Sequence, residues 1–229
     1  MPTPRTSGTR DAHRSPLSRE VVLTAAIAVA DTEGDGSLTI RSVAQHLGVQ
    51  PMALYYHFAN KREIVDGMLD RVFGEIDLPD VHGDWRTEMA RRAQSARAVL
   101  RRHPWAIPLL QSGTAPGPAT LRHHDALIGT LRRAGFSVPM TAHAYALIDS
   151  YVYGFALSET ALPINGPQSV SEVAEEMVRQ HPLEGYPHLA EFSRTHIMAP
   201  GYDFGAEFEF GLDVILEGLA QRLQQADSR

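Results

Sequence analysis

The stretch LTIRSVAQHLGVQPMALYYHFANKREI, residues 38–64, decides the fold of this chain. Thr39 is suited to cap a helix, because a threonine hydroxyl can accept a hydrogen bond from the first helical turn. Gly48 follows nine residues later and supplies the left-handed residue that commonly ends a helix. Between them the apolar residues share one helical face, at Val43, Ala44 and Leu47.

A short third helix is predicted over Pro51–Phe58, since proline suits the first helical position. Asn60 with Glu63 resembles a capping pair that opens a fourth helix. Two short helices separated by a tight turn make a helix-turn-helix, whose second helix can enter the major groove of DNA.

The aromatic residues at the end of the predicted third helix favour a DNA-binding motif over an ordinary helical hairpin. Tyr55, Tyr56 and His57 are consecutive, so they cannot all face one core, and at least one must meet solvent or a partner. A phenol or imidazole donor beside Lys61, at the start of the next helix, is a good clamp for a phosphate.

The segments around this motif also predict helices. Residues 1–16 are polar and rich in breakers, which indicates a flexible arm, and a first helix runs from its cap Ser18 to the stop Gly34. Further helical periodicity covers Trp85–His103, Ala119–Ala134, Thr141–Ala161, Val170–Arg179 and Phe204–Gln224. We therefore expect an all-α fold, with a three-helix helix-turn-helix domain at 17–63 followed by a second helical domain at 64–229.

Charge is distributed unevenly along the chain. The net charge is −6, yet residues 1–62 carry seven basic and five acidic side chains and so have a net charge of +2. A mildly basic head on an acidic body lets phosphates approach one end only, although ordinary scatter of charge would also give this difference. The chain has no apolar run of membrane-spanning length, and its N-terminus lacks the apolar core of a secretory signal, so we expect a cytoplasmic protein that does not associate with membranes. It has no cysteine, which excludes disulfides and thiolate metal sites.

Residues 38–64 closely resemble the DNA-binding domain of the TetR family, in AQHLGV, in LYYHF and in the following NKRE. The resemblance implies that Thr39, Tyr55, His57 and Lys61 contact phosphates, and that Arg41, Gln50, Pro51, Met52 and Ala53 face bases. It places Tyr56 partly within the domain. Arg41 is the strongest candidate for base readout, because a guanidinium matches the two acceptors of guanine; a solvated surface charge is its alternative.

The rest of the chain resembles the ligand-binding domain of the Tet repressor subgroup of that family. The resemblance rests on Trp85, RRHP ending at Pro104, Gly117-Pro118, LRRAGFS at 131–137 and YVYGFALSE at 151–159. It implies a homodimer through helices near 141–161 and 204–224, which binds a palindromic double-stranded operator. A stripe in the last helix fits such an interface or plain core equally well: Phe208, Leu212, Ile215, Leu219 and Leu223.

The positions that hold tetracycline and magnesium in that subgroup are changed here. Leu110 stands at a metal-binding histidine, Phe73, Arg92 and Leu127 replace polar anchors, and Ser150 and Ser158 replace residues that hold metal waters. Magnesium requires oxygen ligands, so the expected effector is a small molecule other than tetracycline–magnesium. The expected pocket is more apolar, with Arg92 available for an anion or a carbonyl; each position could also be ordinary core. Its predicted lining is Phe73, Arg92, Ala96, Leu110, Leu127, Tyr151 and Tyr153.

Two other classes of function were weighed against a ligand-released repressor. An enzyme is disfavoured because the chain lacks HExxH, GxSxG, phosphate-loop and GxGxxG motifs, and adjacent His123 and His124 diverge by about 100° on a helix. A calcium loop starting at Asp31 fails at its twelfth position, Ser42. No catalytic residue, cofactor or metal is therefore predicted. A helical scaffold protein would show no sequence-specific binding to duplex DNA.

Overall fold

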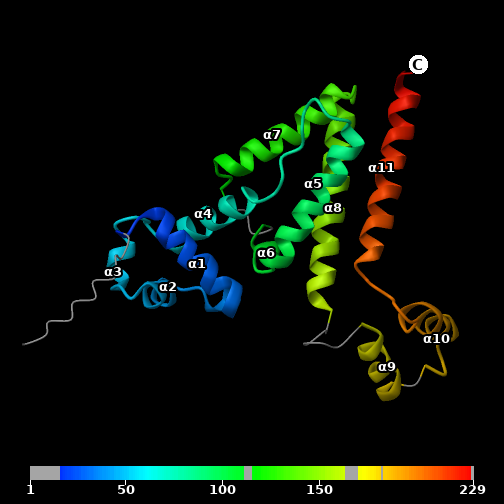
Figure 1. Ribbon diagram of the computed structural model, residues 1–229, viewed down its shortest axis with the longest axis horizontal. Coiled ribbons are helices and arrows are strands. Elements are labelled where there is room, and N and C mark those ends of the chain that lie inside the picture. Colours follow the sequence, from blue (N-terminus) through cyan, green and yellow to red (C-terminus); the bar gives the residue numbers. More distant parts are fainter. Residues whose placement is uncertain (1–15, 111–114, 163–169, 182, 228–229) are drawn as a thin grey trace, which may run out of the picture. The chain divides into compact units, whose positions relative to one another are not determined.

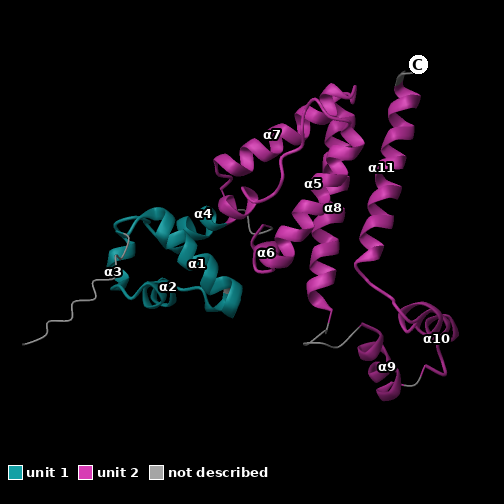
Figure 2. Cartoon of the chain, viewed as in Figure 1, with its two compact units in different colours: residues 1–68 teal, residues 69–229 magenta. Residues whose placement is uncertain are grey.

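The computed structural model describes residues 16–110, 115–162, 170–181 and 183–227. Every regular element in these ranges is helical (Figure 1), which confirms the all-α expectation. The chain divides into two compact units, residues 1–68 and 69–229 (Figure 2). The predicted arm at 1–16 lies almost entirely outside the described residues.

The first unit begins with the two helices that their caps predicted. Helix α1 (Arg19–Glu33) is capped by Ser18 and ends at Gly34. After a short 3₁₀ turn (η1, Asp35–Ser37), α2 (Ile40–Leu47) starts at Thr39 and ends at Gly48, whose φ of 65° lies in the left-handed region that glycine adopts without strain. Both predictions from the sequence are confirmed.

The third helix is shorter than predicted. Helix α3 covers only Pro51–Leu54, and the chain continues as a hydrogen-bonded turn before α4 (Lys61–Phe73), which runs across the boundary between the units. Leu54 and Phe58, on either side of this turn, both lie in the core, where they are 0% and 2% exposed. The turn between them leaves Tyr56 89% exposed, so the expectation that Tyr56 packs partly within the domain was wrong.

The core of the first unit gathers the apolar faces of all four helices. Val22, Ala26 and Val29 of α1 lie against α2, and Met68 of α4 is also fully buried. Close packing between α1 and α4 is possible because a Cβ at Gly67 would lie only 2.9 Å from the side chain of Leu23. The framework around the helix-turn-helix is therefore well packed.

The second unit adds the rest of α4 and seven further α-helices within the described ranges. They are α5 (Trp85–Arg102), α6 (Ala106–Leu110), α7 (Pro118–Arg133), α8 (Val138–Ala161), α9 (Val170–Gln180), α10 (Pro187–Phe192) and α11 (Ala206–Asp227), with a π-helical turn, η2 (Ser193–Ile197), after α10. The five periodic segments are confirmed as α5, α7, α8, α9 and α11. The short helices α6 and α10 were missed, because four to six residues are too few to show a 3.6-residue period.

Helix α5 lies at the centre of this unit and packs against α7, α8 and α11. Arg97 of α5 pairs with Glu159 of α8 at 2.6 Å, and its guanidinium lies 4.8 Å from the centre of the Phe208 ring of α11. Phe208, Leu212 and Leu219 are at most 3% exposed within one chain. The apolar stripe of the last helix is therefore mainly core, the second of its two interpretations.

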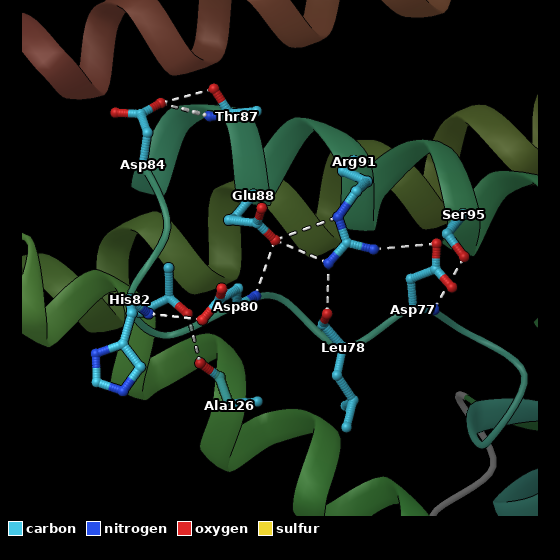
Figure 3. A network of polar contacts seen from close by, with 11 residues as sticks. Asp77, Leu78, Asp80, His82, Asp84, Thr87, Glu88, Arg91, Ser95 and Ala126 are labelled. Atoms are coloured by element: carbon cyan, nitrogen blue, oxygen red, sulfur yellow. Dashed lines mark hydrogen bonds and ion pairs between the residues drawn. The ribbon is translucent and has the colours of Figure 1, made fainter.

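The segment between α4 and α5 is attached to α5 by a polar network (Figure 3). Arg91 donates to the Leu78 carbonyl at 2.5 Å and pairs with Asp77 at 3.1 Å and with Glu88 at 2.8 Å. Glu88 in turn accepts from the backbone N–H of Asp80 at 2.8 Å. Because these bonds satisfy backbone groups of an irregular segment, it needs no secondary structure to stay ordered.

None of the described helices combines the length and the apolar character needed to cross a bilayer.

Candidate DNA-binding surface and effector site

The candidate DNA contacts are mostly exposed side chains of the helix-turn-helix. The side chain of Met52 is 69% exposed and that of Tyr55 is 47% exposed. Arg41, Gln50 and Lys61 are exposed as well. Pro51, Ala53 and His57 are half-buried. Within the described ranges, Arg41 forms no hydrogen bond or ion pair, so its guanidinium is available to a partner outside the chain.

Thr39 has a structural task besides its predicted phosphate contact. Its hydroxyl accepts from the backbone N–H of Ser42 at 2.9 Å, and the Ser42 hydroxyl accepts from the backbone N–H of Thr39 at 2.9 Å. This reciprocal capping box fixes the start of α2 and thereby the direction of the Arg41 backbone.

Arg19 and Glu63 hold the turn after α3, and the sequence reasoning missed both in this role. Arg19 pairs with Glu63 at 2.7 Å, donates to the His57 carbonyl and lies 4.2 Å from the centre of the Phe58 ring. Glu63 also accepts from the backbone N–H of Ala59 at 2.7 Å, and this bond, followed by that from Arg19, lowers the pKa of Glu63. The capping pair was recognisable from Asn60 and Glu63, but nothing in the sequence pointed to Arg19.

The second unit contains a buried polar cluster centred on Arg92 of α5. Its Nε donates to Nε2 of His123 at 2.8 Å, and its Nη1 pairs with Asp149 of α8. Tyr153 donates to the other Asp149 oxygen at 3.4 Å. Arg92 and His123 are fully buried and Asp149 is 6% exposed, so burial lowers the pKa of His123 to about 3, helped by the positive charge of Arg92.

The predicted effector residues separate into groups. Phe73 lies with its ring centre 5.8 Å from that of His123, so Phe73, Arg92 and Tyr153 meet around the cluster. Ala96 and Leu127 are fully buried, and Leu110 is half-buried at the end of α6. Arg92 is not available in the way we expected, because two of its three nitrogens are engaged.

Tyr151 faces a different part of the unit. It donates to the carbonyls of Glu207 and Phe208 at 3.0 Å and stacks on the Phe208 ring with centres 5.4 Å apart. Its position in the α8–α11 packing explains why a Cβ at Gly211 would lie 2.2 Å from the Tyr151 oxygen. Tyr151 therefore holds α11 in place and does not join the Arg92 cluster.

A cavity of about 480 Å³ opens between α7 and α8. Its lining is mainly apolar, with one arginine, and was not predicted from the sequence: His124, Ile128, Arg132, Val138, Thr141, Ala142 and Tyr145. The Tyr145 hydroxyl lies 2.6 Å from Nδ1 of His124, and burial together with the charge of Asp149 raises the pKa of Tyr145 to about 12.

Comparison with protein families matches both parts of the chain. Residues 22–68 match the bacterial regulatory proteins of the tetR family, and residues 78–223 match the tetracyclin repressor-like C-terminal domain. The chain belongs to the TetR family. Since the second match covers more than half of the residues, the resemblance drawn from the helix-turn-helix and from the body is confirmed.

Similar proteins agree with this membership. The HTH-type transcriptional repressor DrrR1 of Streptomyces coeruleorubidus is 33% identical, with 89% of this chain and 77% of that protein covered. The class A tetracycline repressor of transposon 1721 from Escherichia coli is also 33% identical, covering 90% of this chain and 92% of the repressor. The structure of ActR from Streptomyces coelicolor in complex with actinorhodin has the same fold, with a TM-score of 0.74, 23% identity and coverage of 91% and 99%.

Membership fixes the class of activity of this TetR-family chain. TetR-family proteins are DNA-binding transcriptional regulators and not enzymes, and their members bind DNA operators and small-molecule ligands.

Proposed function

We propose that this chain is a cytoplasmic repressor that binds a palindromic operator as a homodimer and is released by a small-molecule inducer other than tetracycline–magnesium. DNA binding is assigned to residues 17–63, and ligand binding with dimerisation to residues 64–229. The observation that carries the proposal is a set of exposed side chains on a capped helix-turn-helix, above all Arg41, which forms no hydrogen bond or ion pair with the described residues.

The proposed DNA contacts divide into two kinds. Arg41, Gln50, Pro51, Met52 and Ala53 read bases, whereas Thr39, Tyr55, His57 and Lys61 hold phosphates and fix the register. We add Tyr56 to the residues that hold phosphates, because its side chain is almost completely exposed. A phosphate contact adds to affinity on any sequence, while a base contact adds to discrimination, so the two kinds can be told apart by experiment.

Uncovered apolar side chains support the proposed dimer. On α8, Leu147 and Leu157 are each 47% exposed; on α11, Phe210 is 71% and Val214 54% exposed. Monomeric proteins rarely leave such residues in water over two neighbouring long helices, and an isologous contact would bury them twice. The Phe208 stripe lies mainly in the core, so these four exposed residues, and not that stripe, support the proposed dimer interface.

The proposed effector site comprises Phe73, Arg92, Ala96, Leu110, Leu127 and Tyr153, together with the cavity between α7 and α8, whereas Tyr151, which is bonded to α11, is not retained in it. Its mainly apolar lining favours an organic molecule over a hydrated ion. Within the described residues, no three histidine or acidic side chains are grouped so as to hold a metal ion. The ligand would favour a spacing of the two helix-turn-helix domains that no longer matches the operator. Binding of the ligand then shifts the dimer away from the DNA-binding state.

The test of DNA binding is a gel-shift titration with the duplex immediately upstream of this protein's own gene, at several stated salt concentrations. We expect Arg41→Ala to reduce the preference over random DNA by about 5- to 150-fold, the value of one bidentate base contact. Tyr55→Ala should weaken specific and random binding alike and lower the slope against salt. Arg122→Ala, which removes the same charge from an exposed site on α7, is the matched control.

Equal binding of the upstream duplex and random DNA by the wild type would rule out regulation of its own promoter. A genome-wide selection with the same protein would then show whether a different operator exists. If Arg122→Ala lost as much as Arg41→Ala, the effect would be one of overall charge and the base-reading assignment would be wrong.

The test of assembly is sedimentation of the full chain. Phe210→Asp introduces a charge into the proposed interface and should convert a dimer into a monomer that no longer shifts operator DNA. Phe192→Asp changes the other phenylalanine that is more than half exposed, on α10, and should leave the dimer intact. A monomeric wild type, or a Phe210→Asp dimer with normal DNA binding, would contradict the proposed interface.

A further inference from the structure

The turn that joins α3 to α4 carries most of the proposed phosphate contacts. Tyr55, Tyr56 and His57 lie in it, and Lys61 follows as the first residue of α4. A donor contributes most to binding when it is already held in place, because ordering a mobile segment on binding costs free energy. The contacts that hold this turn therefore bear on the affinity for DNA.

Two backbone groups of the turn are bound by side chains from other helices of the first unit. The His57 carbonyl accepts from Nη1 of Arg19, the first residue of α1. The backbone N–H of Ala59 donates to Oε2 of Glu63 in α4 at 2.7 Å. Nη1 of Arg19 also pairs with Oε1 of Glu63 at 2.7 Å. These contacts form a closed ring, which we call the Arg19–Glu63 ring, through both side chains and back along the turn.

The Arg19–Glu63 ring spans Phe58, the buried residue of the turn. Phe58 is 2% exposed, and the Arg19 guanidinium lies 4.2 Å from the centre of its ring. The backbone N–H groups of Phe58 and His57 both donate to the Leu54 carbonyl at 3.0 Å. The bonds to Arg19 and Glu63 then fix the backbone immediately before and after Phe58.

The charge of Glu63 is unfavourable for a residue so near the proposed phosphate contacts. It lies two positions after Lys61, and by charge alone a carboxylate there repels DNA. Its bonds to the turn give a physical reason for an acid at this position. A carboxylate offers a separate acceptor oxygen to each of two donors, here the N–H of Ala59 and the guanidinium of Arg19.

We propose that Arg19 and Glu63 are positioning residues for DNA binding, which hold the turn after α3 in the arrangement that lets its donors meet phosphates. Neither side chain contacts DNA in this arrangement. The proposal rests on the proposed function, because it takes the turn as part of the DNA-binding surface. It implies that an acidic side chain strengthens binding to a polyanion, the opposite of what its charge predicts.

The first test is the sign of the effect of Glu63→Gln. The change removes a negative charge, so charge alone predicts tighter binding, whereas loss of positioning weakens it. Phosphate contacts add affinity on any sequence, so the full chain is titrated with a random-sequence duplex at fixed low salt. We expect binding about three- to tenfold weaker than wild type, the cost of ordering one or two side chains on binding. Equal or tighter binding would overturn the proposal.

Glu33→Gln is the matched control for charge. Glu33 is exposed at the end of α1, in the same unit, and the substitution removes the same charge without touching the turn. It should bind the random duplex at least as tightly as wild type. If Glu33→Gln weakened binding as much as Glu63→Gln, the effect would not come from the Arg19–Glu63 ring.

Arg19 needs a separate test, because an exposed arginine is also able to contact a phosphate directly. Removing a cation that contacts a phosphate lowers the slope of log affinity against log salt by about one per contact, and we expect this for Lys61→Gln. Arg19→Gln should weaken binding but keep the wild-type slope. A fall in slope equal to that of Lys61→Gln would mean that Arg19 itself holds a phosphate, contrary to the proposal.

Two double variants ask whether the whole ring matters or only its ion pair. Arg19→Gln with Glu63→Gln should bind no more weakly than the weaker single variant, because both changes break one ring. Arg19→Glu with Glu63→Arg restores an ion pair, but its side chains cannot donate to the His57 carbonyl or accept from the N–H of Ala59. It should remain weak. Additive losses in the first, or full recovery in the second, would contradict the proposal.

A measurement without DNA separates positioning from a general loss of structure. Amide ¹⁵N relaxation of the full chain reports mobility residue by residue. In Arg19→Gln and Glu63→Gln we expect greater mobility at His57 and Ala59, with no change at Val43 in the core of α2. Wild-type mobility of the turn in both variants, or increased mobility throughout the helix-turn-helix domain, would overturn the proposal.

The outcome does not depend on the existence of an operator. If the wild type binds no operator better than random DNA, but Glu63→Gln still binds the random duplex more weakly, the positioning role stands and the operator proposed above fails. If the wild type prefers its upstream duplex while Glu63→Gln binds as tightly as wild type, the operator stands and the positioning role fails.

Discussion

The helix-turn-helix and the Arg92 cluster place their polar groups in opposite ways. The candidate DNA contacts come from 23 consecutive positions, Thr39–Lys61, and most of them are exposed, with Arg41 unpaired in the described structure. The cluster comes from α5, α7 and α8, its members are buried, and most of their polar atoms are bonded to one another.

This difference separates binding from stability. An exposed side chain with no partner in its own unit can be changed at almost no cost to folding, so its loss is measured by DNA binding. A buried, charged side chain is part of the fold as well as of the site, because its removal strands the partner.

The largest effect is expected from Arg92→Leu. It leaves the Asp149 carboxylate buried without its cation, a change that typically costs about 3–5 kcal/mol. Urea unfolding at a fixed protein concentration measures the loss. The double variant with Asp149→Leu removes both charges and should recover most of it. If the free energy of unfolding of Arg92→Leu lay within about 1 kcal/mol of wild type, water would reach the Arg92–Asp149 pair, and the pair would behave like an exposed one.

A smaller loss, about 1–2 kcal/mol, is expected from Gly117→Ala at the start of α7. The new Cβ would lie 2.3 Å from Cγ of Asp70, whose carboxylate caps α7 by accepting from the N–H and the hydroxyl of Thr120 at 2.8 and 2.9 Å. Asp70 must withdraw, so the cap is lost. Thermal unfolding of Gly129→Ala provides the control: that Cβ finds its nearest atom at 3.5 Å, and an alanine inside a helix should stabilise.

The same cap can be tested by additivity. If Gly117→Ala acts only by displacing Asp70, adding it to Asp70→Ala should cost nothing further. Full additivity of the two losses would show that the alanine disturbs something other than the cap.

Acid should destabilise the body through His123. Its pKa is about 3 in the folded protein against 6.5 for an ordinary histidine, so between these values the unfolded chain binds a proton that the folded chain does not. Stability therefore falls as pH decreases below about 6.5, by up to ~1.4 kcal/mol per pH unit. Unfolding free energies at pH 7 and pH 5.5 measure this slope, above the range in which most carboxylates titrate.

His123→Phe should flatten that slope, leaving the part due to His124, whose pKa burial also lowers. Exposed His143→Gln should leave it unchanged. An unaltered slope in His123→Phe would mean that the imidazole is protonated in the folded state, contrary to the bond it accepts from Arg92.

The smallest effect on stability is expected in the head. Tyr56→Ala and Met52→Ala, at side chains 89% and 69% exposed, should change the free energy of unfolding by less than about 0.5 kcal/mol while weakening operator binding. Leu54→Ala, between them in sequence but fully buried, should cost about 2–5 kcal/mol. A loss above 1 kcal/mol in Tyr56→Ala would show that its ring packs against the protein after all.

The same contrast explains what the sequence could predict. Helix ends in the head are set by local chemistry, such as the Thr39 hydroxyl and the left-handed Gly48, so they could be placed to the residue. The early end of α3 could not, because its C-cap, Tyr55, has right-handed helical backbone angles and is not a glycine, so no local signal marks the end. Tyr56 was misplaced for the same reason.

In the body, periodicity located the long helices but not the partners of their buried polar residues. Arg92 was singled out, yet Asp149 lies 57 positions away and nothing local marks it as a partner. His123 was considered only as half of an adjacent pair, because the bond that fixes its role comes from α5. The Phe208 stripe shows the corresponding ambiguity of apolar residues, since core and interface have the same period.

Lys61 has a consequence for chemistry at the bench. It is the only lysine in the sequence, and it lies exposed at the first position of α4, beside the aromatic turn of the helix-turn-helix. Reagents that acylate amines therefore have a single ε-amino target in this chain. The rate at which that one group is modified, followed by mass spectrometry with and without duplex DNA, gives a footprint of the head without any introduced label.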